Sequence, residues 1–232
     1  MTGCPAYYDT SYFDETPKVP SKIRKVAFSL GVSLVKSRSM WRLMQDQILS
    51  LRDKFKEAEL EVVFHHSLDR KVYNAAYGVH NAHIERHLQF AKWLDKENIS
   101  YVDVSGSADA MTAYYYNVDL HVGYRVHAHI FMNSVSKLSL LIAEDGRAKG
   151  SESAIGGMVI DGYDDYRTNI TDRLAAKLKL PRDNYIPNQN SNRDMVHMLE
   201  YELRSGAQKS QSARALINQN FMQMRNYINS LP

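Results

Sequence analysis

The chain has 232 residues, of which 44% are hydrophobic and 24% are charged. This is the composition of an ordinary globular protein, and the chain is long enough to bury a core without disulfides. Its single cysteine, Cys4, excludes an intramolecular disulfide and a thiolate-rich zinc site. The formal net charge of +3 is too small to indicate a polyanionic partner by itself.

The amino-terminal segment has neither the basic start nor the apolar stretch of a signal peptide. No apolar run approaches the roughly 20 residues that a helix needs to span a bilayer. These features favour a cytoplasmic protein that does not enter the membrane.

The composition changes along the chain, and we expect three parts. Residues 1–21 are rich in tyrosine, proline and acid without a sustained period, and are predicted to form an extended arm over the body of the protein or a neighbour. Residues 22–165 are predicted to form an α/β core domain, and residues 166–232 a helical C-terminal region.

Within the core, apolar runs and helical periods alternate. Strands are predicted over residues 23–35, 61–66, 99–104 and 138–143 from their β-branched and apolar content. Between them, helices are predicted from Ser37 or Ser39 to about Phe55, up to about Asn98, and over residues 107–117, while residues 124–135 fit either structure. Strands separated by helices favour right-handed crossovers, so we expect an α/β fold with a mostly parallel sheet flanked by helices.

The last third has a different pattern. Helices are predicted over residues 169–180, 192–204 and 210–230, with a loop from Pro181 to Asn192. The final helix carries an apolar stripe among amides and a few cations: Ile217, Phe221, Met224 and Ile228. This stripe favours packing on the body, homo-oligomerisation or binding of a protein partner. Contact of its amides and arginines with nucleic acid is a less favoured alternative, because the chain has no recognised nucleic-acid motif.

Eight of the nine histidines fall between His65 and His129. His80, His83 and His87 lie within about 60° of one another on a helix, in the sector that also holds Phe90 and Leu94. They are therefore predicted to face inward, where an imidazole needs a hydrogen bond, a charge partner or a metal ion. One hypothesis is a metal site of these three histidines, with Mg²⁺, Mn²⁺ or Zn²⁺ as cofactor; the alternative is that they are structural.

Polar side chains also follow the predicted strands. In open α/β sheets, ligands bind beyond the carboxyl ends of the strands. The candidates there are His65 and His66, then Asp103, Ser105, Gly106 and Ser107, then Glu144 and Asp145. The Ser105–Ser107 turn precedes a predicted helix, whose free N–H groups can hold a phosphate.

Two local resemblances involve these loops. The spacing Asp103-x-Ser105-x-Ser107 resembles the metal-adhesion loop of von Willebrand A-type domains, although in that family the motif ends the first strand. Residues 140–151, with the acid pair Glu144 and Asp145, are similar to the diphosphate loop of phosphoribosyltransferases, although Glu152 stands where that family usually has a hydroxyl residue. Each resemblance covers about a dozen residues, and the second implies a transferase acting on a phosphorylated ligand.

Three hypotheses follow from these residues. The first is a small α/β enzyme that binds a phosphorylated or nucleotide-like ligand through Ser105, Gly106 and Ser107, with His66, Asp103, Glu144 and Asp145 as acid–base or metal-binding groups. The second is a non-enzymatic assembly or binding protein, viral or encoded by a mobile element, that uses the arm and the C-terminal helix. The third is a metal-dependent hydrolase with histidine ligands.

Overall fold

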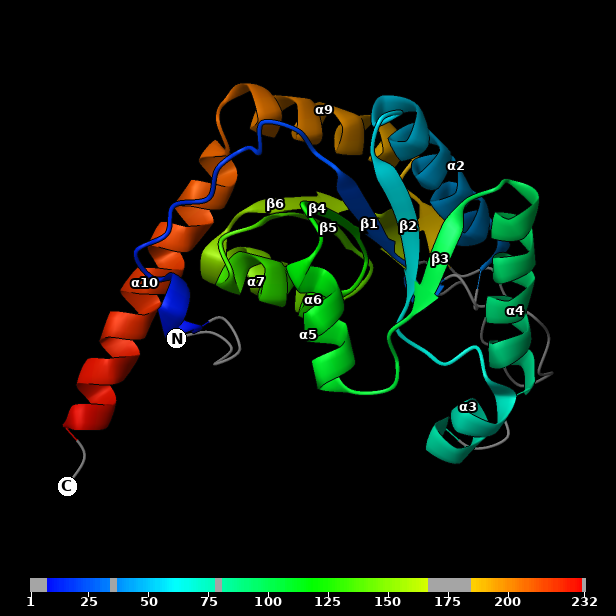
Figure 1. The fold of residues 1–232 in the computed structure, drawn as a ribbon, viewed down its shortest axis with the longest axis horizontal. Coiled ribbons are helices and arrows are strands. Elements are labelled where there is room, and N and C mark those ends of the chain that lie inside the picture. Colours follow the sequence, from blue (N-terminus) through cyan, green and yellow to red (C-terminus); the bar gives the residue numbers. More distant parts are fainter. Residues whose placement is uncertain (1–7, 34–36, 78–80, 167–184, 231–232) are drawn as a thin grey trace.

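The computed structural model describes residues 8–33, 37–77, 81–166 and 185–230. Its centre is a six-stranded sheet in the order β3-β2-β1-β4-β5-β6, in which every neighbouring pair is parallel (Figure 1). The strands are β1 (Lys25–Ser29), β2 (Glu59–Phe64), β3 (Ser100–Asp103), β4 (Leu120–Gly123), β5 (Leu138–Ala143) and β6 (Met158–Asp161). The predicted α/β class with a parallel sheet and a helical C-terminal region is confirmed.

Helices cover both faces of the sheet (Figure 1). One face is covered by α2 (Arg38–Lys54), α4 (Asn81–Lys96) and α9 (Ser191–Arg204). The other face is covered by α5 (Ala108–Tyr116), α6 (Val126–Ser134) and α7 (Gly146–Ile155). The last helix, α10 (Gln208–Asn229), packs against α6 and α7. A short helix, α3 (Arg70–Tyr77), lies between β2 and α4.

Alternation along the strands divides the core into layers. On β1, Val26 and Phe28 belong to the cluster beneath α2 and α4, whereas Ala27 belongs to the cluster beneath α5 and α6. Successive residues of a strand point to opposite faces, so one apolar strand supplies both layers. The central strand is consequently buried on both sides.

Two strands of the sheet are missing from the sequence-based prediction. β4 and β6 have four residues each, and β4 contains His121, so neither has a long β-branched run. A separate hairpin pairs β7 (Tyr163–Tyr166) with β8 (Tyr185–Pro187), the latter within the predicted loop. The predicted helix over residues 169–180 lies outside the described residues.

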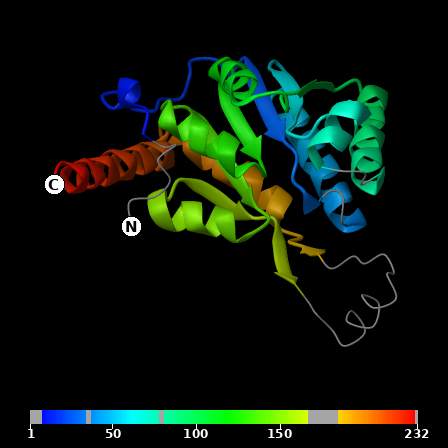
Figure 2. The same cartoon turned by 90° about the horizontal axis from the view of Figure 1, so that it is seen from below.

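The described part of the arm contains a short 3₁₀ turn (Thr10–Tyr12) and lies along α10 (Figures 1 and 2). Phe13 packs edge-on against Phe221 with ring centroids 4.4 Å apart, and its carbonyl accepts a hydrogen bond from Asn218. Farther along, Gln211 donates to the carbonyl of Pro17. None of the described helices is long and apolar enough to cross a membrane.

Candidate functional site at the carboxyl edge of the sheet

The order of the strands defines where a ligand is expected. The chain leaves β3 through α5 and returns to the sheet at β4, beside β1 rather than beside β3. In doubly wound sheets, this reversal opens a crevice beyond the carboxyl ends of the two central strands. Here the reversal falls between β1, which ends at Ser29, and β4, which ends at Gly123.

Glu144, which follows β5, contacts the loop that follows β1. Its buried carboxylate accepts hydrogen bonds of 3.0 Å from the backbone N–H of Val32 and of Ser33, and one of 2.8 Å from the Ser33 hydroxyl. A Cβ at Gly31 would lie 2.4 Å from a carboxylate oxygen of Glu144, so only glycine fits there. The N–H groups after β1, which could receive an anion, are thus held by the protein's own carboxylate.

Asp103 and Asp145 also shape their own loops. The carboxylate of Asp103 accepts backbone hydrogen bonds from Ser105 at 2.9 Å and Leu68 at 2.8 Å. Burial opposes ionisation of Asp103, but the hydrogen bonds outweigh it and hold its pKa below the ordinary value. Asp145 caps α7 and forms an ion pair of 2.6 Å with Arg147.

The serine turn after β3 is a helix cap and part of a cavity wall. Ser107 caps α5 by accepting a hydrogen bond of 3.0 Å from the N–H of Ala110. A cavity of about 540 Å³ lies next to it, between α5 and α6. Its polar lining includes Ser105, Ser107, His65 and His127, and its apolar lining includes Met111, Ile130 and Phe131. Gly106 does not line this cavity.

Arg125 begins α6 at the end of β4 and reaches toward the end of β2. Its Nη2 lies 2.8 Å from Nδ1 of His66, while its backbone N–H donates to the hydroxyl of Ser29. Burial, followed by the charge of Arg125, lowers the pKa of both His65 and His66 to about 3. These imidazoles are therefore neutral near pH 7, and Arg125 brings a permanent positive charge to the carboxyl edge of the sheet.

His65 and His66 follow β2 directly, in a bend of the chain, and have different surroundings. His65 lies on the α5 side, where its Nε2 is 2.9 Å from the hydroxyl of Tyr115. His66 lies among the side chains of α3 and α4, with its ring 5.3 Å from that of His87. Arg125 contacts His66, and its charge also acts on His65. It was not among the candidates from the sequence, because residues 124–135 fitted either a helix or a strand.

The inward histidines of α4 belong to this second group. His87 is 1% exposed, as the helical phase predicts, and its Nδ1 lies 3.0 Å from the carbonyl oxygen of His83. Nδ1 of His83 lies 2.6 Å from the hydroxyl of Tyr73. His80, the third predicted metal ligand, lies outside the described residues. Within the described ranges, no group of three or more histidine, cysteine, aspartate or glutamate residues is arranged to hold a metal ion.

His121 and His129 form a separate buried network, although the sequence had suggested His129 as a candidate further member of the histidine site. Nδ1 of each ring lies 2.8 Å from the hydroxyl of Ser139, and Nε2 of His121 lies 2.8 Å from that of Ser29. Burial lowers the pKa of both rings, that of His129 to about 3. These two histidines are neutral core residues between the sheet and α6.

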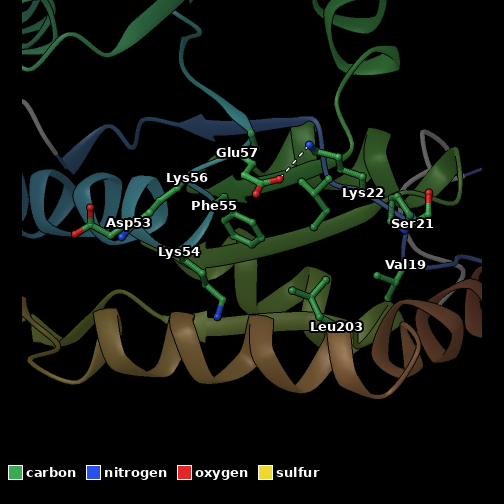
Figure 3. A pocket seen from close by; sticks show the side chains of 12 residues that line it. Val19, Ser21, Lys22, Asp53, Lys54, Phe55, Lys56, Glu57 and Leu203 are labelled. Carbon is green, nitrogen blue, oxygen red and sulfur yellow. Dashed lines mark ion pairs between the residues drawn. The ribbon is translucent and has the colours of Figure 1, made fainter.

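A cavity of about 640 Å³ lies at the opposite, amino edge of the sheet (Figure 3). Its lining comes from the segment before β1, the end of α2 and Leu203 of α9, and includes the ion pair of Lys22 with Glu57 at 3.0 Å. Strand carboxyl ends do not reach this edge, and none of the predicted site residues lines it. We therefore place the candidate site at the carboxyl edge, around Arg125 and the α5–α6 cavity.

Comparison with known proteins adds no relative: no protein-family model, curated protein or solved structure matches the chain.

Proposed function

We propose that the protein is an α/β enzyme that binds a phosphorylated, nucleotide-like ligand at the carboxyl edge of its sheet. Arg125 takes the phosphate, and the cavity lined by Ser105, Ser107, His65 and His127 takes the remainder of the ligand. The observation that carries the proposal is the position of Arg125, which lies where the strand order reverses between β1 and β4 and at the amino end of α6. A guanidinium in this place matches the charge and the geometry of a phosphate.

The chemistry of the cavity supports the same class of ligand. Imidazole and hydroxyl groups can hydrogen-bond to a sugar or a base, and Met111 and Phe131 offer apolar walls. A volume of about 540 Å³ falls in the range of small-molecule sites.

The acids at this edge have structural partners. Asp103 and Glu144 accept hydrogen bonds from backbone N–H groups of loops, and Asp145 accepts one from the first turn of α7. We therefore assign them to holding the loops in place, and we assign acid–base chemistry to histidine. A divalent cation such as Mg²⁺ would then arrive with a polyphosphate ligand rather than in a ready-made cage of the protein.

The test is thermal stabilisation by adenosine monophosphate, ribose 5-phosphate and inorganic phosphate. We expect adenosine monophosphate to raise the Tm of the wild type, and Arg125→Gln to weaken its binding about tenfold or more, as expected for a lost charged hydrogen bond. Ser107→Asn keeps the helix cap and should bind normally, whereas Ser107→Asp keeps the cap but should repel the phosphate. Arg204→Ala, on the distant α9, is the matched control. Equal stabilisation of wild type and Arg125→Gln would contradict the proposal.

A second candidate function, assembly through α10, is favoured by the exposed end of that helix. Its final turns extend beyond the body of the protein and leave Met222, Tyr227 and Ile228 between 50% and 66% exposed (Figure 2). If this surface mediates self-association, Tyr227→Ser with Ile228→Ser should lower the mass measured by light scattering without changing the Tm. A monomeric wild type at micromolar concentration would contradict self-association.

A further inference from the structure

The hydrogen bond between Arg125 and His66 determines which nitrogen of His66 carries the proton. A guanidinium can donate but cannot accept, so Nδ1 of His66, 2.8 Å from Nη2 of Arg125, is the acceptor. In the neutral ring the proton is therefore on Nε2. His66 cannot use Nδ1 as a base while Arg125 occupies it.

The contacts of His87 determine the opposite tautomer. Its Nδ1 lies 3.0 Å from the carbonyl oxygen of His83, and a carbonyl can only accept. Nδ1 of His87 therefore carries the proton, and Nε2 carries a lone pair. This Nε2 is buried and receives no hydrogen bond from the part of the chain that the structure describes, an arrangement that is costly for a polar atom.

The two rings are close neighbours with complementary groups. Their centroids are 5.3 Å apart, nearer than those of His66 and His83 at 6.2 Å. His66 brings an N–H at Nε2, and His87 brings an acceptor at Nε2. Among the described residues, the charged and titratable groups around His66 include Arg125 before α6, Tyr73 of α3, His83 and His87 of α4, Asp103 of β3 and the adjacent His65.

We infer that His66 is a general base that becomes available when an anion binds Arg125, and that His87 is the residue that positions it. The inference rests on the proposed function, because a bound phosphate must draw the guanidinium of Arg125 away from Nδ1 of His66. A hydroxyl group of the ligand can then transfer its proton to this Nδ1, while the electron pair of the broken O–H bond stays on oxygen. The imidazolium that forms donates its Nε2–H to the lone pair of His87.

The experiment is NMR of the imidazole nitrogens in the full chain, with adenosine monophosphate and inorganic phosphate as probes. Without a probe we expect the Nε2–H tautomer for His66 and the Nδ1–H tautomer for His87. Saturation with either probe should change the Nδ1 resonance of His66 and raise the apparent pKa of His66 by about one unit or more, because the anion offsets the charge of Arg125. His197 on α9 is an internal control and should not change.

Two variants test the role of His87. Gln keeps an acceptor near Nε2, so His87→Gln should preserve the ligand-induced rise in the His66 pKa, whereas His87→Phe should abolish it. If His87→Phe does not fold, the wild-type tautomers still decide, since a proton on Nδ1 of His66 in the free protein overturns the inference. Binding that depends on Arg125 but leaves the tautomer and pKa of His66 unchanged would refute this inference alone. Absence of any binding would refute the proposed function as well.

Discussion

At the scale of single residues, the carboxylates predicted from the sequence to be catalytic accept hydrogen bonds from backbone groups of the protein. Glu144 was nominated because it follows a buried strand beside Asp145, yet its oxygens accept three hydrogen bonds from Val32 and Ser33. These hydrogen bonds favour a role in holding the loop after β1, which we weigh against the predicted catalytic role. The distinction between these roles can be measured without knowing the substrate.

Glu144→Gln should therefore destabilise the fold. The amide NH₂ would face one of the donors of Ser33 or Val32, leaving a buried donor unsatisfied at a cost of about 1–3 kcal/mol in the free energy of unfolding. Urea titration measures this loss. Glu152→Gln is the control, since the carboxylate of Glu152 is exposed and pairs only at the surface with Lys149 at 3.3 Å. Unchanged stability of Glu144→Gln would favour a catalytic role instead.

At the scale of elements, α10 combines two environments in one helix. Its first half packs against α6 and α7 through Ala213 and Ile217, both fully buried, and the arm covers Phe221. The following turns leave the body, which is why the apolar stripe predicted from the sequence ends on exposed Ile228. Deletion of the whole helix would therefore test the core and the surface at once.

Neighbouring residues of α10 separate these effects. Ile217→Ala should lower the free energy of unfolding by roughly 2–4 kcal/mol, because it opens a cavity in a closed core. Leu216→Ala, at a side chain that is 40% exposed, should change it by less than about 0.5 kcal/mol. Denaturant unfolding of the two variants gives both values. Equal losses would mean that α10 is packed differently from the structure.

At the scale of the whole molecule, buried neutral histidines make stability depend on pH. The folded protein holds the pKa of His129 at about 3 and that of His121 well below 6.5, whereas unfolded histidine titrates near 6.5. The unfolded chain thus binds more protons below pH 6.5. The stability these rings contribute is complete above that pH and falls as pH decreases toward the folded pKa.

Urea unfolding between pH 7.5 and 5 should therefore show a decline that steepens below pH 6.5. Each ring contributes up to about 1.4 kcal/mol per pH unit to the slope. His129→Gln should reduce the proton uptake on unfolding, which sets this slope, by close to one proton. This holds even if the variant is less stable at pH 7.5. A slope that is the same in wild type and variant would argue against a neutral, buried His129.

The sequence by itself determined the properties that arise from local periodicity. Apolar runs and helical spacing predicted the α/β alternation, and the phase of the α4 helix placed His87 in the interior. The strand β4 was not predicted, because its four residues, which include His121 and Gly123, do not form a β-branched run. Ser105 and Ser107 were located correctly at a strand end, but their cavity was not foreseeable.

Only the tertiary structure decided the order of the strands and the partners of the polar side chains. It placed β4 beside β1. It also paired Arg125 with His66, 59 residues away in the sequence, and Glu144 with Ser33, 111 residues away. Such pairings depend on how the crossovers pack, and local propensity carries no information about them. The sequence thus marked the carboxyl edge and its histidines, whereas folding selected which groups bind, which hold loops and which are buried in the core.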